Sequence, residues 1–154
     1  MQRQPMTANA SYCKTGEPAG PQKPPTERDQ FMDNFKEIFA AYGVDYDATL
    51  RRFAGNMVLY LRVLGMLPND KSLEKLGAAI DSGDLDNAFE AAHTLKGVAG
   101  NLGLTPLLEA VHTIVEPLRE REERSDYAQL YTAVQAEYQK AEAFVETINS
   151  IRQI

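Results

Sequence analysis

The sequence predicts an all-α fold, an antiparallel four-helix bundle with additional short N-terminal helices. Apolar residues recur at the three- and four-residue spacing of a helix from about Asp29 onwards. The sequence lacks the alternating β-branched runs that are typical of strands. Short loop-like stretches separate the amphipathic segments, which favours antiparallel neighbours. With 154 residues, 44% of them hydrophobic, the chain has room for one domain with a core.

The N-terminal residues differ in composition from the rest of the chain. They contain few large aliphatic side chains but many prolines and glycines, namely Pro5, Gly16, Pro18, Gly20, Pro21, Pro24 and Pro25. Such a segment buries too little apolar surface to offset the entropy lost on ordering. We therefore predict a disordered Pro-rich tail or linker over residues 1–28 and the helical-bundle domain over residues 29–154.

An aromatic stripe predicts the first helix of the domain. Apolar residues at i, i+4, i+7 and i+8 mark one helical face that stops at Gly43, and they are Phe31, Phe35, Ile38 and Phe39. Asp47 is then a suitable N-cap for a short helix through Phe53, which Gly55 ends.

Residues 57–67 predict a further apolar helix, and Pro68 is expected to interrupt the chain after it. Proline has no backbone N–H, and it disfavours the helical conformation of the residue before it. The turn-forming Asn69 and Asp70 follow. The next helix is predicted to carry its apolar face at Leu73, Leu76 and Ile80.

Capping residues delimit the last three predicted helices. Asp84 is a suitable N-cap for a helix that Gly103 ends in a left-handed turn. Thr105 and Pro106 are typical of an N-cap followed by the first helical residue, and Ser125 is expected to start the final helix. The buried stripes of these last two helices are predicted to be Leu107, Leu108, Val111, Ile114, Val115 and Leu118, and Leu130, Val134, Tyr138, Ala141, Val145 and Ile148.

The helix that follows Asp84 sets one histidine apart from its apolar stripe, which consists of Leu85, Ala88, Ala92, Leu95, Ala99 and Leu102. At about 100° per residue, His93 lies roughly 140° from the centre of that stripe and faces solvent. Lys96, Gly97 and Gly100 surround it at i+3, i+4 and i+7. An interior glycine costs a helix about 0.5–1 kcal/mol relative to alanine. We interpret the two glycines as keeping the surface beside the imidazole open to another protein.

The eleven-residue sequence HTLKGVAGNLG that begins at His93 resembles the histidine-containing phosphotransfer (HPt) domain family of two-component phosphorelays. It matches the family pattern H-x-L-K-G-x-A-x-x-L-G in register, and the resemblance covers about residues 43–118 well and the rest of the globular part loosely. In many such domains one long helix spans the region of residues 57–80, so the expected break at Pro68 is a departure. The resemblance implies that His93 is the phosphoacceptor and that Lys96 stabilises the phosphoryl charge.

The same resemblance implies a function and a set of partners. The protein would accept a phosphoryl group from a receiver-domain aspartyl phosphate onto His93 and pass it to another receiver aspartate. Its expected partners are response-regulator receiver domains and a hybrid sensor histidine kinase. No cofactor is expected to bind this chain itself, because the receiver domain supplies Mg²⁺ in the family. Gly97 and Gly100 are expected at the docking surface, where Phe89 is equally well a partner contact or part of the core's rim.

Other classes of function find less support in the sequence. It contains no nucleotide-binding loop and no recognisable catalytic triad. We therefore expect a phosphocarrier without ATP-dependent kinase activity of its own, and whether it acts as an enzyme stays open. The alternative is a non-catalytic helical adaptor, which would need no nucleophile.

Two further features are given structural interpretations. His112 lacks a third ligand for a metal and is interpreted as a surface histidine. Residues 116–123 are interpreted as a solvated helix end.

The composition argues against some classes of partner and indicates a cellular compartment. A net charge of −6 argues against a nucleic-acid-binding surface. No apolar run approaches the roughly 18–20 residues that span a bilayer, so no membrane contact is expected. The single cysteine, Cys13, cannot form an internal disulfide and fits a reducing compartment. We expect a cytoplasmic monomer.

Overall fold

The computed structural model describes residues 20–152, and the predicted tail lies largely outside these residues. The described part is helical and contains no strand. Its elements, in chain order, are α1 (Glu27–Tyr42), α2 (Tyr46–Arg52), α3 (Met57–Leu64), the 3-10 turn η1 (Leu67–Asn69), α4 (Ser72–Ser82), α5 (Leu85–Leu102), α6 (Thr105–Arg119) and α7 (Tyr127–Arg152).

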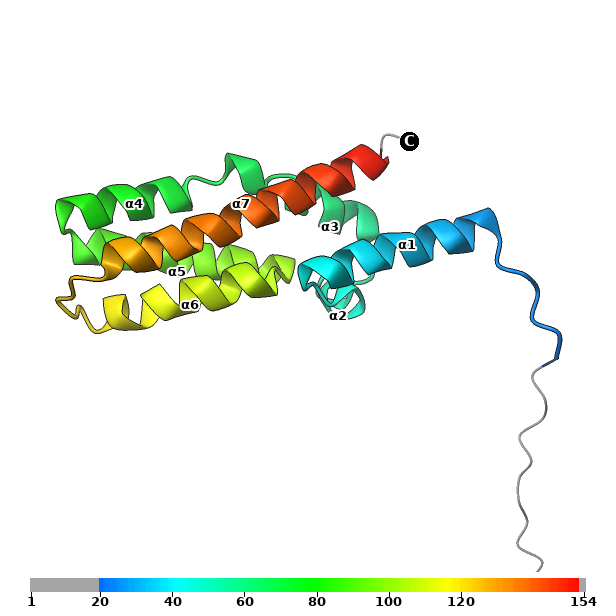
Figure 1. The fold of residues 1–154 in the computed structure, drawn as a ribbon, viewed down its shortest axis with the longest axis horizontal. Coiled ribbons are helices and arrows are strands. Elements are labelled where there is room, and N and C mark those ends of the chain that lie inside the picture. The colour runs from blue at the N-terminus through cyan, green and yellow to red at the C-terminus, as the bar shows by residue number, and fades with distance from the viewer. Residues whose placement is uncertain (1–19, 153–154) are drawn as a thin grey trace, which may run out of the picture.

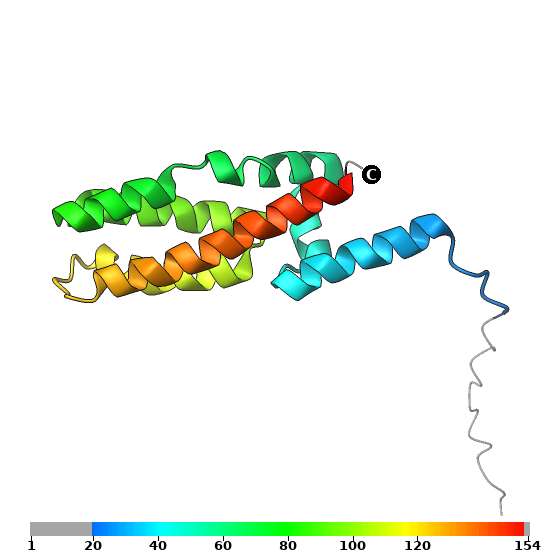
Figure 2. The same ribbon diagram turned by 45° about the horizontal axis from the view of Figure 1, so that its top comes forward.

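Helices α4 to α7 form the predicted antiparallel bundle (Figure 1). Consecutive helices pack against each other, and α7 closes the bundle by packing on α4. Helices α1, α2 and α3 lie at one end of the bundle, and the first turns of α1 extend beyond it in both views (Figures 1 and 2). The predicted fold class is therefore confirmed, and α1 stops at its C-cap Gly43 as predicted but starts at Glu27, two residues inside the predicted tail.

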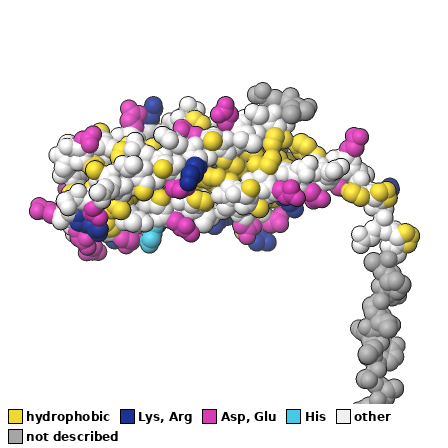
Figure 3. All heavy atoms as spheres, viewed as in Figure 1, with side chains coloured by type: hydrophobic (Ala, Val, Ile, Leu, Met, Phe, Trp, Pro, Cys, Tyr) yellow, Lys and Arg dark blue, Asp and Glu magenta, His cyan; other side chains and the backbone are white. Residues whose placement is uncertain are grey.

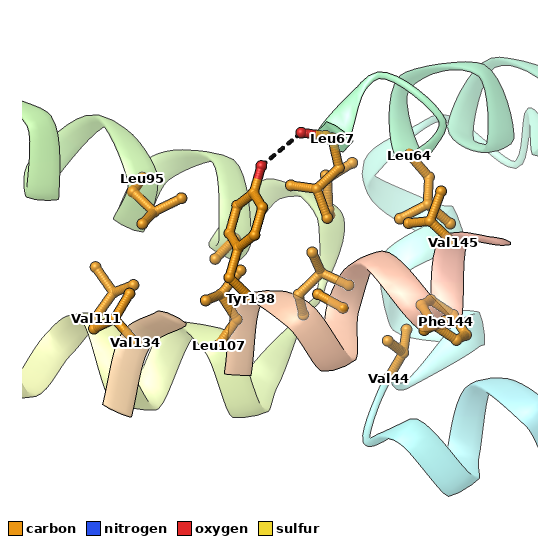
Figure 4. Packing of buried hydrophobic residues seen from close by; sticks show 14 of the residues in the cluster. Val44, Leu64, Leu67, Leu95, Leu107, Val111, Val134, Tyr138, Phe144 and Val145 are labelled. Carbon is orange, nitrogen blue, oxygen red and sulfur yellow. Dashed lines mark hydrogen bonds between the residues drawn. The ribbon is translucent and has the colours of Figure 1, made fainter. Parts of the chain in front are cut away.

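The bundle core is built from the apolar faces of all four long helices (Figure 4). Leu95, Leu107, Val111 and Val134 have no solvent-exposed surface. The core also contains polar contacts, and in one of them the hydroxyl of Tyr138 donates a hydrogen bond of 2.7 Å to the backbone carbonyl of Leu67 (Figure 4). A buried hydroxyl without a partner would be destabilising, so this bond fixes the tyrosine and the turn together.

An aromatic cluster attaches the N-terminal helices to the bundle. Phe39 is fully buried and lies at the centre of the cluster. Its ring centroid is 5.0 Å from the ring of Tyr46 on α2, 6.0 Å from Tyr60 on α3 and 5.0 Å from Phe144 on α7. The hydroxyl of Tyr60 donates to the carbonyl of Leu102 at the end of α5. Three helices are thereby joined to the C-terminal half of α7 and to the end of α5.

The short helix α2 begins earlier than the sequence predicts. Its N-cap is Asp45, whose carboxylate accepts a hydrogen bond of 2.9 Å from the backbone N–H of Ala48. The predicted cap, Asp47, lies instead in the first turn and forms an ion pair of 3.4 Å with Lys36 of α1. Because Val44 is buried directly after α1, the chain has already turned by residue 45 and the helix can start there.

The break at Pro68 is confirmed, and it begins before the proline. Helix α3 ends at Leu64, three residues before the predicted end at Leu67. Residues 67–69 form the 3-10 turn, in which Asp70 donates to the carbonyl of Leu67. The same carbonyl accepts a hydrogen bond from the hydroxyl of Tyr138. The Leu67 carbonyl, which takes part in no α-helical hydrogen bond, therefore has two donors.

Two further helix starts are displaced from their predicted positions. Leu104, not Thr105, is the N-cap of α6, and the Thr105 hydroxyl turns back to the carbonyl of Gly103. Helix α7 begins at Tyr127 rather than at Ser125. Just before it, the guanidinium of Arg124 binds both carboxylate oxygens of Asp126, at 2.8 and 2.7 Å, which holds these residues in a turn.

Apolar and acidic side chains are unevenly distributed over the surface. On the face shown in Figure 3, acidic side chains lie along the bundle, whereas apolar side chains gather toward the end where α1 and α3 pack. The most exposed large apolar residues are Val58 and Met66, each 61% exposed, followed by Phe31 and Leu59.

Candidate functional site

Helix α5 presents His93 to solvent because both ends of the helix are fixed as predicted. The carboxylate of Asp84 accepts a hydrogen bond of 3.1 Å from the backbone N–H of Asn87, and Gly103 ends the helix with φ of 70°. Ala92 and Leu95 are then fully buried against the neighbouring helices. His93 lies between them in the sequence, points to the other side and is exposed.

The surface beside His93 is bare at the two glycines of α5. A Cβ atom added to Gly97 would meet no atom within 4 Å, and one added to Gly100 would meet only the side chain of Leu108, at 3.9 Å. Neither glycine is needed for packing between helices. By contrast, a Cβ on Gly77 of α4 would lie 2.7 Å from Cζ of Tyr131, so this glycine is required by packing. The open surface expected beside the imidazole is therefore present, while its role in docking stays a prediction.

Phe89 lies one turn before His93 and contacts it directly. The two rings stack with centroids 5.6 Å apart and an angle of 28° between their planes. Two guanidinium groups from the end of α6 lie over the phenyl ring, that of Arg121 at 4.7 Å and that of Arg119 at 5.8 Å from its centroid. Phe89 is half-buried under these contacts. It joins the imidazole to charged groups of the neighbouring helix.

Lys96 lies on the side of α5 that faces α6. Its ammonium is 3.7 Å from Oε1 of Glu116, and 29% of its side chain is exposed. The same carboxylate oxygen lies 3.4 Å from Nη2 of Arg119 and 3.7 Å from Nδ1 of His112. Glu116 is thus shared by Lys96, Arg119 and His112.

The end of α6 contributes more to the site than its sequence suggests. Residues 116–123 were expected to be a solvated helix end, yet Glu116, Arg119 and Arg121 all contact residues on the His93 side of α5. The sequence could have indicated the contact between Phe89 and Arg119. In an antiparallel pair of helices, residues at similar distances from the connecting turn lie opposite each other, and these two lie at similar distances from the turn at Gly103. The exposed position of His112 agrees with its interpretation as a surface histidine.

Helix α2 contacts the C-terminal end of the α5 surface that carries His93. The guanidinium of Arg52 donates a hydrogen bond to the backbone carbonyl of Gly100. A cation is favourable at this position, because the C-terminal carbonyls of a helix carry partial negative charge. The contact places a positive group at the C-terminal end of the surface that runs from His93 along the glycines.

Two general features of residues 20–152 complete the description. No group of three or more His, Cys, Asp or Glu side chains in this part of the chain is arranged to hold a metal ion. Within the same residues, no helix combines the length and the apolar character needed to cross a membrane.

Comparison with known proteins gives one match. A family model described as "Hpt domain" matches residues 68–144, which is half of the chain. Neither the comparison with curated proteins nor that with solved structures found a match. The matched residues run from η1 into α7 and include His93 with the α5 and α6 side chains around it.

Proposed function

The chain belongs to the Hpt domain family, whose members take part in histidine phosphotransfer in phosphorelays, and from this premise we propose that His93 is the phosphoacceptor. The observation that carries the proposal is the exposed imidazole beside the open surface at Gly97. In-line attack requires the phosphorus of a partner to approach a ring nitrogen closely. A bare helix surface beside the ring allows a second protein to come that near.

The proposed chemistry needs only the imidazole of this chain and an aspartyl phosphate of a receiver domain. The neutral form of an imidazole carries a free lone pair on one of its two ring nitrogens. That nitrogen attacks phosphorus, the N–P bond forms, and the P–O bond to the aspartyl group breaks with its electron pair leaving on the carboxylate. The proton on the other ring nitrogen stays in place. Attack by the aspartate of a second receiver on the phosphoimidazole reverses the step.

We propose that Lys96 stabilises the phosphoryl oxygens after it exchanges partners. Its ion pair with Glu116 is partly exposed, and such pairs contribute only about 0–1 kcal/mol to stability. A phosphoryl group on His93, one turn away, carries more negative charge than one carboxylate and competes for the ammonium.

The proposal assigns the remaining parts of the reaction to the partners. Receiver domains would dock over Phe89, Gly97 and Gly100, and a hybrid sensor histidine kinase would feed the relay. Mg²⁺ would arrive with the receiver's aspartate, and the chain would act as a phosphocarrier without using ATP itself. The family resemblance around His93 supports this division of roles.

The test is transfer from a phosphorylated receiver in the presence of Mg²⁺. The protein should gain phosphate that is labile to acid and stable to alkali, as phosphoimidazole is. His93→Gln should abolish labelling and leave the helical CD spectrum unchanged, because the side chain is exposed. His112→Gln is the matched control and should still be labelled. Label that persists in His93→Gln would contradict the proposal, and receiver binding without any labelling would support the adaptor instead.

A further inference from the structure

Arg121 makes three hydrogen bonds where the C-terminal end of α6 lies beside the first turn of α5. Its Nη1 donates to the backbone carbonyls of Leu118, at 2.7 Å, and Arg119, at 3.2 Å, at the end of α6. Its Nε donates to the carboxylate of Asp86, at 2.5 Å, in the first turn of α5. The planar guanidinium, whose donors form a rigid fork, is therefore hydrogen-bonded to groups from two helices at once.

The backbone of Arg121 is in a locally unfavourable conformation. Its φ of 53° lies in the left-handed region, which non-glycine residues adopt infrequently. A glycine or asparagine would accept this turn more readily. Ala54 adopts the same φ, so what distinguishes Arg121 is the hydrogen bonding of its side chain and not its backbone.

The fixed guanidinium lies against the ring that contacts the phosphoacceptor. Its Cζ is 4.7 Å from the centroid of Phe89, a cation–π distance, and Phe89 stacks on His93. Phe89 is half-buried at the edge of the core, and Arg121 is the nearer of the two guanidinium groups that cover its ring. A continuous series of contacts thus runs from Asp86 through Arg121 and Phe89 to the imidazole.

We infer that Arg121 is a positioning residue for phosphotransfer, which holds the ring of Phe89 and through it the orientation of the His93 imidazole. The inference rests on the proposed role of His93. In a helix a histidine has two common χ1 rotamers and a roughly two-fold χ2, hence about four orientations of its ring. If one of them presents the nitrogen lone pair to the incoming phosphorus, fixing that orientation raises the transfer rate by up to about fourfold.

The experiment compares three variants in single-turnover transfer from a saturating phosphorylated receiver. Arg121→Gly removes the side chain and suits the left-handed backbone, so it should fold and should transfer about three- to fourfold more slowly, with unchanged receiver affinity. Arg121→Lys keeps the charge but cannot span the same three acceptors, and it should be equally slow. Arg124→Ala removes a neighbouring arginine that pairs with Asp126 and Glu122, and it should transfer at the normal rate.

NMR of the imidazole provides a readout that a purely structural role would not move. The ring current of Phe89 should shift the carbon-bound ring protons of His93 in the unmodified protein. Arg121→Gly should move these signals toward those of an unstacked histidine, and Arg124→Ala should leave them in place. Phe89→Leu should slow transfer to the same extent, with no further loss in the double variant with Arg121→Gly, because both act through one contact.

The outcomes separate this inference from the proposal on which it rests. Normal transfer by Arg121→Gly, or by Arg121→Lys, would overturn the positioning role, the latter because charge alone would then account for the effect. Slow transfer by Arg121→Gly without a change in the NMR signals of the His93 ring protons would also overturn the positioning role. If His93→Gln abolishes labelling in the same assay, the proposed function stands whatever the Arg121 variants do. If His93→Gln is still labelled, the proposed function fails first.

Discussion

Replacing Gly97 by leucine should separate the stability of α5 from its proposed use as a docking surface. An added Cβ at this position meets nothing within 4 Å, so the new side chain extends into solvent. Leucine is preferred over glycine in a helix interior by about 0.5–1 kcal/mol. The variant should therefore be more stable, with an unfolding temperature raised by about 1–4 °C for a domain of this size.

The same change should slow transfer from a receiver by more than tenfold. Side chains on a helix lean toward its N-terminus, so a leucine at position 97 leans toward His93, one turn earlier. It would hold the docking protein away from the imidazole. A displacement of about 1 Å from the productive geometry can lower a rate by roughly a hundredfold.

The measurements are thermal unfolding by CD and single-turnover transfer from a phosphorylated receiver. Phosphoramidate, a small phosphodonor that needs no docking, should phosphorylate the Gly97→Leu variant at nearly the normal rate. Gly77→Ala is the matched control on α4. Its Cβ would displace Tyr131, whose hydroxyl donates to the carbonyl of Leu73 at 3.2 Å. Overpacking costs about 1–3 kcal/mol, so this variant should unfold at lower temperature but transfer normally.

A lowered unfolding temperature in Gly97→Leu would refute the open-surface reasoning, since it would mean that the glycine is packed. Unchanged receiver transfer with raised stability would leave the geometry intact and reject its role in docking. An equal loss of rate with phosphoramidate and with the receiver would show that leucine disturbs the imidazole itself.

Three further predictions concern the N-terminus, alkaline pH and the charges of the site. Deleting residues 1–25 should leave the urea midpoint unchanged, because the described part of that segment, residues 20–25, is exposed. Deleting residues 1–42 removes the buried Phe35 and Phe39 and should cost several kcal/mol, because burying each is worth about 1.5–3 kcal/mol. Burial raises the pKa of Tyr138 to about 12, so the unfolded chain loses this proton near pH 10 while the folded chain keeps it. Stability should therefore fall between pH 10 and 12, and a Tyr138→Phe variant measured by urea unfolding should fall less steeply. Glu116→Gln should release Lys96 and speed phosphorylation of the protein several-fold at low salt, with little change in stability, and an unchanged rate would argue against a role for the lysine.

Features that depend on a single residue and its near neighbours could be predicted from the sequence. They include much of the fold and the exposure of His93. Asp84 and Gly103 act within one turn of their own positions, so the bounds and the exposed face of α5 followed directly from them. The break at Pro68 was predictable for the same reason, since a missing N–H is a property of one residue.

Features that depend on distant residues were not predictable. The start of α2 at Asp45 depends on how the chain turns after α1, and two aspartates two positions apart offer the same cap chemistry. The contact between Phe89 and Arg121 joins residues on either side of the α5–α6 hairpin through a left-handed backbone that no sequence pattern marks. A basic residue at a helix end is most often solvated, and only the packed hairpin shows that this one covers an aromatic ring.

The aromatic cluster also sets an order of events during synthesis. Phe39 and Phe144 lie more than a hundred residues apart in the chain, yet their rings meet edge to face. At translation rates of about 5–20 residues per second, the first helix waits roughly 5–20 s for its partner to leave the ribosome. During that interval Tyr46 and Tyr60 can already contact Phe39, but the part of the α1 face that Phe144 covers stays exposed on the nascent chain. The last helix to emerge is therefore the one that completes the burial of the first.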